Sequence, residues 1–131
     1  MKEYQRNKNN PYKLPHNVYM QVLYAVRDYD RLRDVYQNNL YNSSNAPDGT
    51  PHSNGPGDPT QNRALRMYSI GRQIESVEQA LVIIPNEYRR GIIDNIKYRC
   101  GYPMDVPAHR DTWSRWRRKF LWQVAQNMGL I

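Results

Sequence analysis

Apolar side chains recur at alternating steps of three and four residues along two long stretches of this 131-residue chain. That spacing matches the turn of an α-helix and differs from the two-residue repeat of a half-buried strand. The first row is Val18, Val22, Ala25, Tyr29, Leu32 and Tyr36, and the second is Met67, Ile70, Ile74, Val77, Leu81 and Ile84. We therefore expect one amphipathic helix over residues 15–42 and an antiparallel partner that begins near residue 58.

Local signals define the limits of these two helices. Asp58 is a suitable N-cap, Pro59 suits the first turn, and Gln61 completes a capping box. Residues 43–57 consist almost entirely of Ser, Asn, Pro and Gly, and we predict a disordered loop there. Residues 1–14 are polar and predict a flexible tail. Gly71, inside the second helix, favours a close approach of the two helices.

Two more helices are expected after Pro85, which ends the second apolar row. Residues 86–100 form the first, closed by Gly101, and its apolar side is Tyr88, Ile92, Ile93 and Ile96. Residues 102–109 contain two prolines and predict a loop. The last helix runs from Asp111, its expected cap, to about residue 128, and Gly129 ends it.

The expected fold class is therefore all-α, because no stretch shows strand alternation between turn signals. It has about four helices in two parts. Residues 15–84 form an N-terminal antiparallel helical hairpin, and residues 85–131 form a C-terminal region similar to a helix-turn-helix.

The last helix has two different sides at 100° per residue. Its apolar side is Trp113, Trp116, Phe120, Leu121, Val124 and Met128, which we expect to be buried. Its other side carries Arg115, Lys119, Trp122 and Gln126 at steps of four, three and four, with no acidic member. A solvated helix face usually mixes both charge signs. Unpaired cations beside Gln and an exposed Trp instead favour contact with phosphates and base edges.

Arg117 is the exception on this helix, since its angle places it on the apolar side. Either its stem extends out to water or the helix is rotated about its axis. Trp122 also has an alternative, which is packing at a dimer contact.

The charge of the whole chain agrees with an anionic partner. The formal net charge is +7, and residues 85–131 alone carry nine basic and four acidic side chains. Such an excess favours nucleic acid. It also serves solubility, so it does not by itself show a partner.

The segments ALVIIPNEYRRGIIDNIKYR and RDTWSRWRRKFLWQVAQNMGL resemble the C-terminal part of RinA/ArpU-type phage late-gene transcriptional regulators. They are also distantly similar to region four of sigma factors, with Ile84-Pro85 at the position of the helix breaker. The resemblance covers about residues 13–131 and implies binding to double-stranded DNA, with RNA polymerase as a further partner. This chain differs from sigma-type domains in one respect, because only YPMDVPAH separates the last two helices, which leaves no room for a separate first helix of the motif. Either the helix over residues 86–100 serves as that first helix, or the motif is degenerate.

The DNA-binding residues that we expect from the helix pattern and the resemblance together all lie in the last helix. They are Arg110, Thr112, Ser114, Arg115, Arg117, Arg118, Lys119 and Trp122. Thr112, Ser114, Arg115 and Arg118 are the ones that a helix-turn-helix would bring to a major groove.

Other function classes find little support in the residues. His16, His52 and His109 lie far apart, and there is one cysteine, Cys100, with no CxxC or HExxH motif, so we expect neither a metal site nor a cofactor. No catalytic constellation is visible, and we expect no enzyme. The N-terminus has no apolar run and no stretch is long enough to span a membrane, which favours the cytoplasm.

Two functions from different classes remain. The first is a DNA-binding regulator, expected to be an activator, of phage or prophage genes. The second is a helical phage assembly or adaptor protein, such as a small DNA-packaging terminase subunit, whose first two helices would build a ring or a dimer. RNA binding ranks last, because the chain lacks the exposed aromatic sheet of the common RNA-binding modules.

Overall fold

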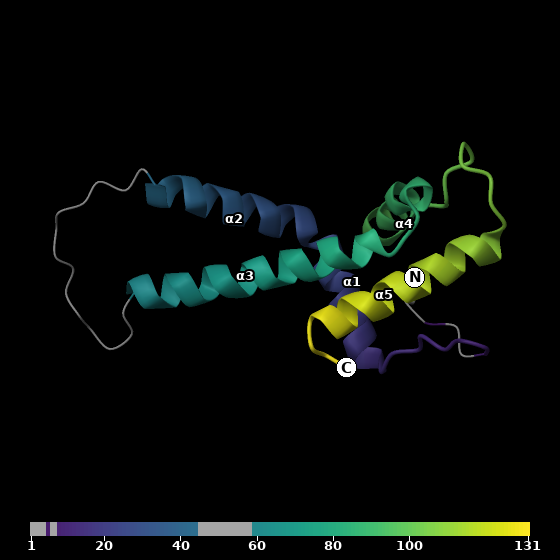
Figure 1. Cartoon of the computed structure of the whole chain (residues 1–131), viewed down its shortest axis with the longest axis horizontal. Coiled ribbons are helices and arrows are strands. Elements are labelled where there is room, and N and C mark those ends of the chain that lie inside the picture. Colours follow the sequence, from purple (N-terminus) through teal and green to yellow (C-terminus); the bar gives the residue numbers. More distant parts are fainter. Residues whose placement is uncertain (1–4, 6–7, 45–58) are drawn as a thin grey trace.

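The computed structural model describes residue 5 and residues 8–44 and 59–131 of the chain (Figure 1). The elements are five α-helices: α1 (His16–Arg27), α2 (Tyr29–Ser44), α3 (Pro59–Val82), α4 (Asn86–Tyr98) and α5 (Arg110–Asn127). No strand occurs in these described ranges, which confirms the all-helical fold class.

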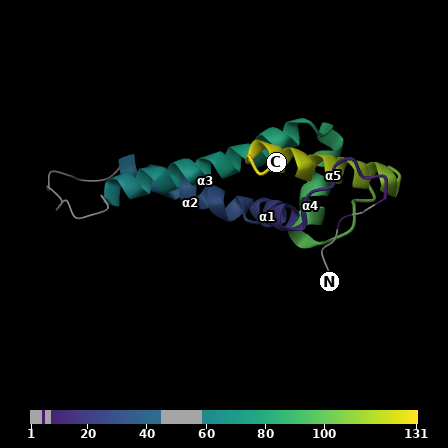
Figure 2. The same cartoon turned by 90° about the horizontal axis from the view of Figure 1, so that it is seen from below.

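The helix predicted over residues 15–42 is in fact two helices, so that prediction was wrong. Asp28 separates α1 from α2, with φ −92° and ψ 0°. Figures 1 and 2 show α1 turning away from the line of α2. The reason is packing, because α1 lies against α4 and α5 whereas α2 lies along α3. The apolar row continues in phase across the junction, so the row alone does not reveal the bend.

The backbone at this bend keeps its helical hydrogen bonds. The Asp28 N–H donates to the Tyr24 carbonyl at 2.9 Å, and the Leu32 N–H donates to the Asp28 carbonyl at 3.0 Å. The Arg31 Nε–H donates to the Asp28 carboxylate at 2.6 Å. The chain thus continues from α1 into α2 through a bend, and the Asp28 carboxylate is hydrogen-bonded to Arg31 of α2.

The antiparallel hairpin is made by α2 and α3, which run side by side on the left of Figure 1. At its centre the ring of Tyr36 lies over Gly71, where a Cβ atom would be 3.2 Å from Tyr36 Cε2. The expected close approach at Gly71 is therefore confirmed. No side chain is buried among residues 33–40 of α2 or 59–73 of α3.

The core lies at the other end of the molecule, where α1, the second half of α3, α4 and α5 meet. Its buried members include Val22, Leu23 and Val26 of α1, Val77 and Ala80 of α3, Ile92 and Ile96 of α4, and Phe120, Leu121 and Val124 of α5. The predicted apolar side of α5 is confirmed, with Trp113 buried and Trp116 half-buried. Because α5 contacts the three other elements, its rotation about its own axis is fixed by the core.

Three helix ends were predicted from single residues. Gly129 does end α5: its φ is +73°, its N–H donates to the Gln126 carbonyl at 3.0 Å, and the Leu130 N–H donates to the Ala125 carbonyl at 2.9 Å. These two bonds form the Schellman arrangement.

The two other predicted ends were wrong. The residue before α5 is His109, whose Nδ1 accepts from the Asp111 N–H at 3.1 Å, so Asp111 lies in the first turn. At the end of α4 the left-handed residue is Arg99 (φ 54°), not Gly101, and Asn95 Nδ2 donates to the Cys100 carbonyl at 2.6 Å. Residues 45–58, with most of the predicted loop and the Asp58 cap, lie outside the described residues; α2 itself extends to Ser44.

Candidate nucleic-acid interface

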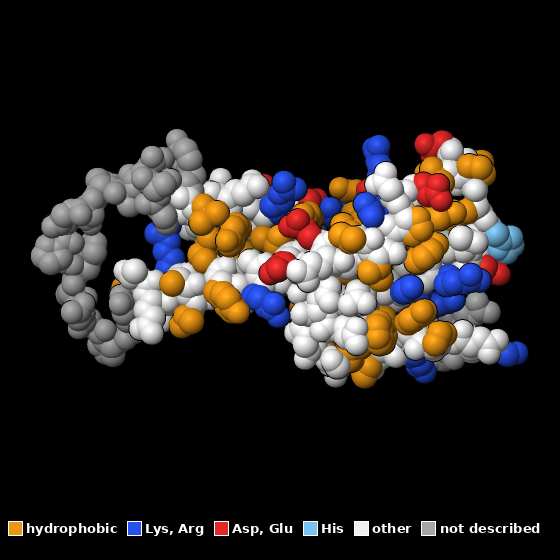
Figure 3. All heavy atoms as spheres, viewed as in Figure 1, with side chains coloured by type: hydrophobic (Ala, Val, Ile, Leu, Met, Phe, Trp, Pro, Cys, Tyr) orange, Lys and Arg blue, Asp and Glu red, His pale blue; other side chains and the backbone are white. Residues whose placement is uncertain are grey.

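The side of α5 that faces away from the core carries cations without intramolecular ion pairs. Arg110 and Arg115 are exposed and Lys119 is half-buried. In the described part of the chain no carboxylate forms an ion pair with any of the three. In Figure 3, Lys and Arg side chains are visible over α5, at the end of the molecule opposite the hairpin tip. Arg115 and Lys119, which lie one turn apart, are called the outer face of α5 below, and Arg110 lies on another side of the helix.

Lys119 is oriented by an aromatic neighbour on its own helix. Its Nζ lies 5.4 Å from the ring centroid of Trp116, within the range of a cation–π contact. Trp116 itself packs against the core. The lysine therefore extends over a fixed ring, which limits the conformations that its charge can sample.

Trp122 was expected to be exposed, and the structure corrects this. The indole is half-buried, and the ring of Tyr12 meets it edge-on, with centroids 5.8 Å apart and planes inclined at 62°. The cause is the path of the N-terminal segment, residues 8–14, which passes beside α5 before α1 begins (Figure 2). Leu14 is buried in the core. The spacing of residues on α5 could not predict that Tyr12, more than a hundred residues earlier in the chain, lies against Trp122.

The N-terminal segment is closed into a loop by one side chain. The Gln5 amide donates to the Leu14 carbonyl at 2.7 Å and accepts from the Leu14 N–H at 2.8 Å. These paired bonds hold residues 8–14 near α5. Tyr12 is thus a residue of the site that sequence reasoning missed, and its only signal was an aromatic ring in an otherwise polar stretch.

Arg117, the cation on the apolar side, is tied into the fold. Its Nε–H donates to Asn95 Oδ1 of α4 at 3.0 Å, and Nη1 donates to the Tyr19 hydroxyl of α1 at 3.2 Å. The side chain is half-buried and joins three helices. The helix is not rotated from the expected orientation, because its apolar side is buried. The Arg117 stem lies within the fold, and its guanidinium group finds polar partners there.

Between the N-terminal segment and α5 lies a groove of about 540 Å³. Arg110, Ser114, Arg117 and Arg118 line it from α5, and Tyr12 and Tyr19 line it from the other side. It contains one acidic side chain, Asp111, against three arginines. We call it the arginine groove. The Nε atom of Arg118 is buried there and has no hydrogen-bond partner.

The eight residues expected to bind DNA thus fall into three groups. Arg115 and Lys119 lie on the outer face, and Thr112, half-buried, lies in the first turn of α5. Arg110 lies at the rim of the arginine groove, and Ser114 and Arg118 line it. Arg117 faces the core side of the groove, and Trp122 is covered by Tyr12.

The connection between α4 and α5 is compatible with a modified helix-turn-helix. It comprises residues 99–109, whereas the usual turn of that motif has three or four residues. The two helices nevertheless touch closely at Gly91, where a Cβ would lie 2.8 Å from Trp113 Cζ3 and 2.7 Å from Pro103 Cδ. Sequence reasoning missed Gly91 as a packing residue.

Metal ligands and membrane-spanning helices were considered for the described residues only. The described residues hold no group of three His, Cys, Asp or Glu side chains that would bind a metal ion. Cys100 is exposed with a free thiol. Across the described ranges, none of the helices combines the length and apolar character needed to cross a membrane.

Comparison of the chain with protein-family models, with curated proteins and with solved structures gives no significant match.

Proposed function

We propose that this protein binds double-stranded DNA through α5 and regulates transcription of phage or prophage genes, as an activator, in the cytoplasm. The observation that supports DNA binding is the outer face of α5, where Arg115 and Lys119 have no acidic partner among the described residues. A duplex carries closely spaced phosphates that such cations neutralise, with release of counterions. The regulatory role is what the family resemblance implies.

The geometry of α5 suits entry into a major groove. The helix is anchored on one side by Phe120, Leu121 and Val124 and presents Thr112, Arg115 and Lys119 on the other. A rigid helix with Arg and Thr near its N-terminal end is the arrangement that reads base edges in helix-turn-helix proteins. Because no further helix lies between α4 and α5, α4 would be the helix that lies across the DNA backbone.

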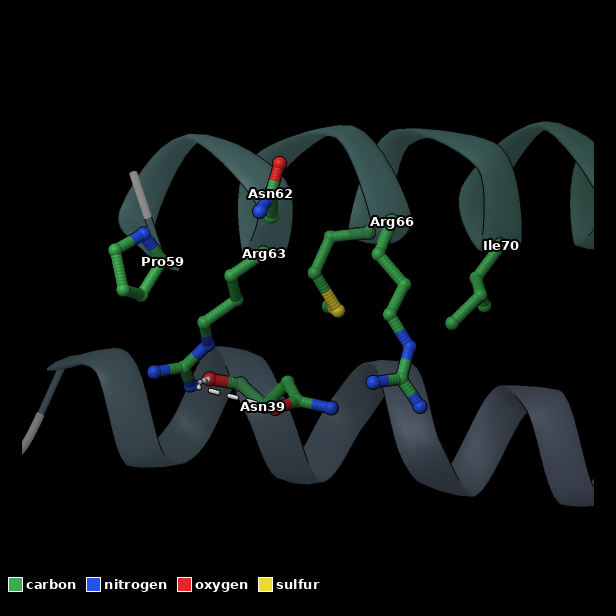
Figure 4. A pocket seen from close by; sticks show the side chains of 7 residues that line it. Asn39, Pro59, Asn62, Arg63, Arg66 and Ile70 are labelled. Carbon is green, nitrogen blue, oxygen red and sulfur yellow. Dashed lines mark hydrogen bonds between the residues drawn. The ribbon is translucent and has the colours of Figure 1, made fainter. Parts of the chain in front are cut away.

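The direct test is a gel shift or fluorescence-anisotropy titration with DNA from a phage late promoter. Arg115→Ala should weaken binding by about five- to a hundredfold, the range expected for a base contact by arginine. Arg66→Ala is the matched control, because it removes the same charge from an exposed residue of the hairpin (Figure 4). Equal losses in the two variants, or no binding by the wild-type protein at low salt, would refute the proposal.

A second candidate, a helical assembly protein of a phage, is favoured by the hairpin. Leu40, Leu65, Tyr68 and Val82 are each more than half exposed there. Apolar side chains gathered on a slender element suit contact with another protein. A second copy of the chain is one such partner, and RNA polymerase is another under the regulator proposal.

Light scattering separates these alternatives. A monomer or dimer that binds promoter DNA supports the regulator, and the hairpin is then free for polymerase or used in the dimer. A closed ring of many copies supports the assembly protein instead.

A further inference from the structure

The arginine groove differs from the outer face of α5 in shape and in chemistry. The outer face is open, whereas the groove is enclosed by α5 on one side and by Tyr12 and Leu14 of the N-terminal segment on the other. Three arginines and one aspartate line it, so it is positive. Arg117 already donates to Asn95 and Tyr19, which leaves Arg110 and Arg118 as the cations available to a ligand.

Arg118 carries an unmet hydrogen-bonding requirement in this groove. Its Nε–H is shielded from solvent and meets no acceptor. A buried donor without a partner is costly, and the cost is greater on a charged group. Because solvent does not reach the Nε–H in this conformation, an anionic oxygen in the groove would accept this bond once the Arg118 side chain turns toward it, and Arg110 would attract the same oxygen.

The remaining lining suits a phosphate rather than a carboxylate or an apolar ligand. The Ser114 and Tyr12 side chains offer hydroxyl groups beside the two arginines. Arginine together with hydroxyl donors is the usual environment of a phosphate group in proteins. The α5 part of the lining runs from Arg110 to Leu121, so only its Arg110 end lies in the first turn, where the helix dipole favours negative charge. Asp111 opposes an anion but is outnumbered by the three arginines of the lining.

We propose that the arginine groove is a phosphate-binding site, with Arg118 and Arg110 as the ligands, and that a phosphodiester of the DNA backbone fills it. This rests on the function proposed above. The groove then supplies a contact that is independent of base sequence, while Arg115 and Lys119 on the outer face remain free to meet base edges. Lys8 and Lys13 of the N-terminal segment are also exposed.

The first experiment measures phosphate binding without DNA. Inorganic phosphate is titrated into ¹⁵N-labelled protein at constant ionic strength, with chloride as the reference anion, and the arginine Nε–H resonances are followed. We expect the Arg118 Nε–H signal to shift with phosphate and saturate. Arg110→Gln, which changes an exposed rim residue and leaves the fold intact, should weaken this binding several-fold. No saturable shift at Arg118 would overturn the proposal.

The second experiment measures the salt dependence of DNA binding. Loss of one phosphate contact lowers the slope of log K against log salt by about 0.9 for a duplex. We expect Arg118→Gln to lower the slope by about this amount on promoter and random DNA alike, and Arg66→Gln to leave it unchanged. Arg118→Lys retains the charge but lacks Nε, and it should restore the slope only in part.

The outcomes distinguish the groove from the proposed function. If wild-type protein binds phosphate at Arg118 but binds no DNA, the proposed function fails and the groove is a site for a free phosphate group. If DNA binding and its slope are unchanged in both Arg110→Gln and Arg118→Gln, the groove proposal fails while DNA binding stands. Circular dichroism of each variant checks that the helices are retained.

Discussion

The indole of Trp113 stacks on the phenol ring of Tyr102, with ring centroids 4.9 Å apart and planes inclined by 10°. Tyr88 of α4 meets the same indole edge-on, also at 4.9 Å. The buried tryptophan near the start of α5 is thus enclosed by α4 and by the loop that follows α4. This packing anchors the N-terminal half of α5, from which Arg115 projects.

A first prediction concerns Gly91, which faces this tryptophan. A methyl group at Gly91 would lie 2.7 Å from Pro103 Cδ and 2.8 Å from Trp113 Cζ3, so α4 and α5 would have to separate. We expect Gly91→Ala to lower the free energy of unfolding by about 1–3 kcal/mol, as overpacking of a core does. Thermal or urea denaturation measures this. Gly101→Ala is the matched control, since nothing lies within 4 Å of its added Cβ, and an equal loss there would contradict the explanation.

A second prediction concerns the bonds of Arg117. Truncation by Arg117→Met removes its hydrogen bonds to Asn95 and Tyr19 and leaves both partners without a donor. We expect a loss of about 1–3 kcal/mol of unfolding free energy. In a double-mutant cycle with Tyr19→Phe, denaturation should reveal a coupling energy of about 0.5 kcal/mol or more. Strict additivity of the two changes would show that the Arg117–Tyr19 bond contributes nothing.

A third prediction concerns pH and the bend between α1 and α2. The hydrogen bond from Arg31 holds the pKa of Asp28 below its usual range. A lowered folded-state pKa means that the pair stabilises the protein above the unfolded pKa of about 3.9 and loses this contribution as pH falls through the folded value. The Arg31 side chain is 65% exposed and the Asp28 side chain 38%, so solvent screens the pair and its contribution is below about 1 kcal/mol.

Denaturation of wild-type protein and Asp28→Asn at neutral and at low pH tests this. The wild-type protein should be slightly more stable at pH 7, and the difference should shrink below about pH 4. A difference that grows on acidification would contradict the assigned ion pair.

A fourth prediction concerns the cover over Trp122. Tyr12→Ala removes the ring that lies edge-on to the indole, so solvent should reach Trp122 more freely. In protein labelled with fluorotryptophan, the ¹⁹F resonance of Trp122 should show a larger H₂O/D₂O isotope shift. The buried Trp113 serves as the internal control, and its resonance should not change. An unchanged Trp122 resonance would show that Tyr12 does not shield it.

Much of the helical content could be predicted because helix formation depends on residues three and four apart. The buried side of α5, the apolar row of α1 and the second half of the α3 row follow from that spacing and were confirmed, whereas Tyr36, Met67 and Ile70 of the predicted rows lie outside the core. The end of α5 was equally predictable, because Gly129 adopts the left-handed conformation that other residues avoid. Arg99 adopts the same conformation at the end of α4 although a glycine lies two residues further on, so the single-residue rule was wrong there.

The candidate site was only partly predictable. The row of cations on α5 and the absence of acidic residues among them are properties of the sequence, and the structure places Arg115 on the outside. Whether each neighbouring cation is open, covered or bonded depends on other helices. Arg117 meets Tyr19, which lies 98 residues away, and Trp122 meets Tyr12.

The sequence by itself therefore determined that the chain is helical, which faces of its helices are apolar, and that residues 85–131 carry most of the net positive charge. These properties follow from local spacing and from composition. Only the tertiary structure decided the bend at Asp28, the cover over Trp122 and the groove that encloses Arg118. Each of these depends on contacts between segments far apart in the chain, and such contacts are fixed when the whole core packs together.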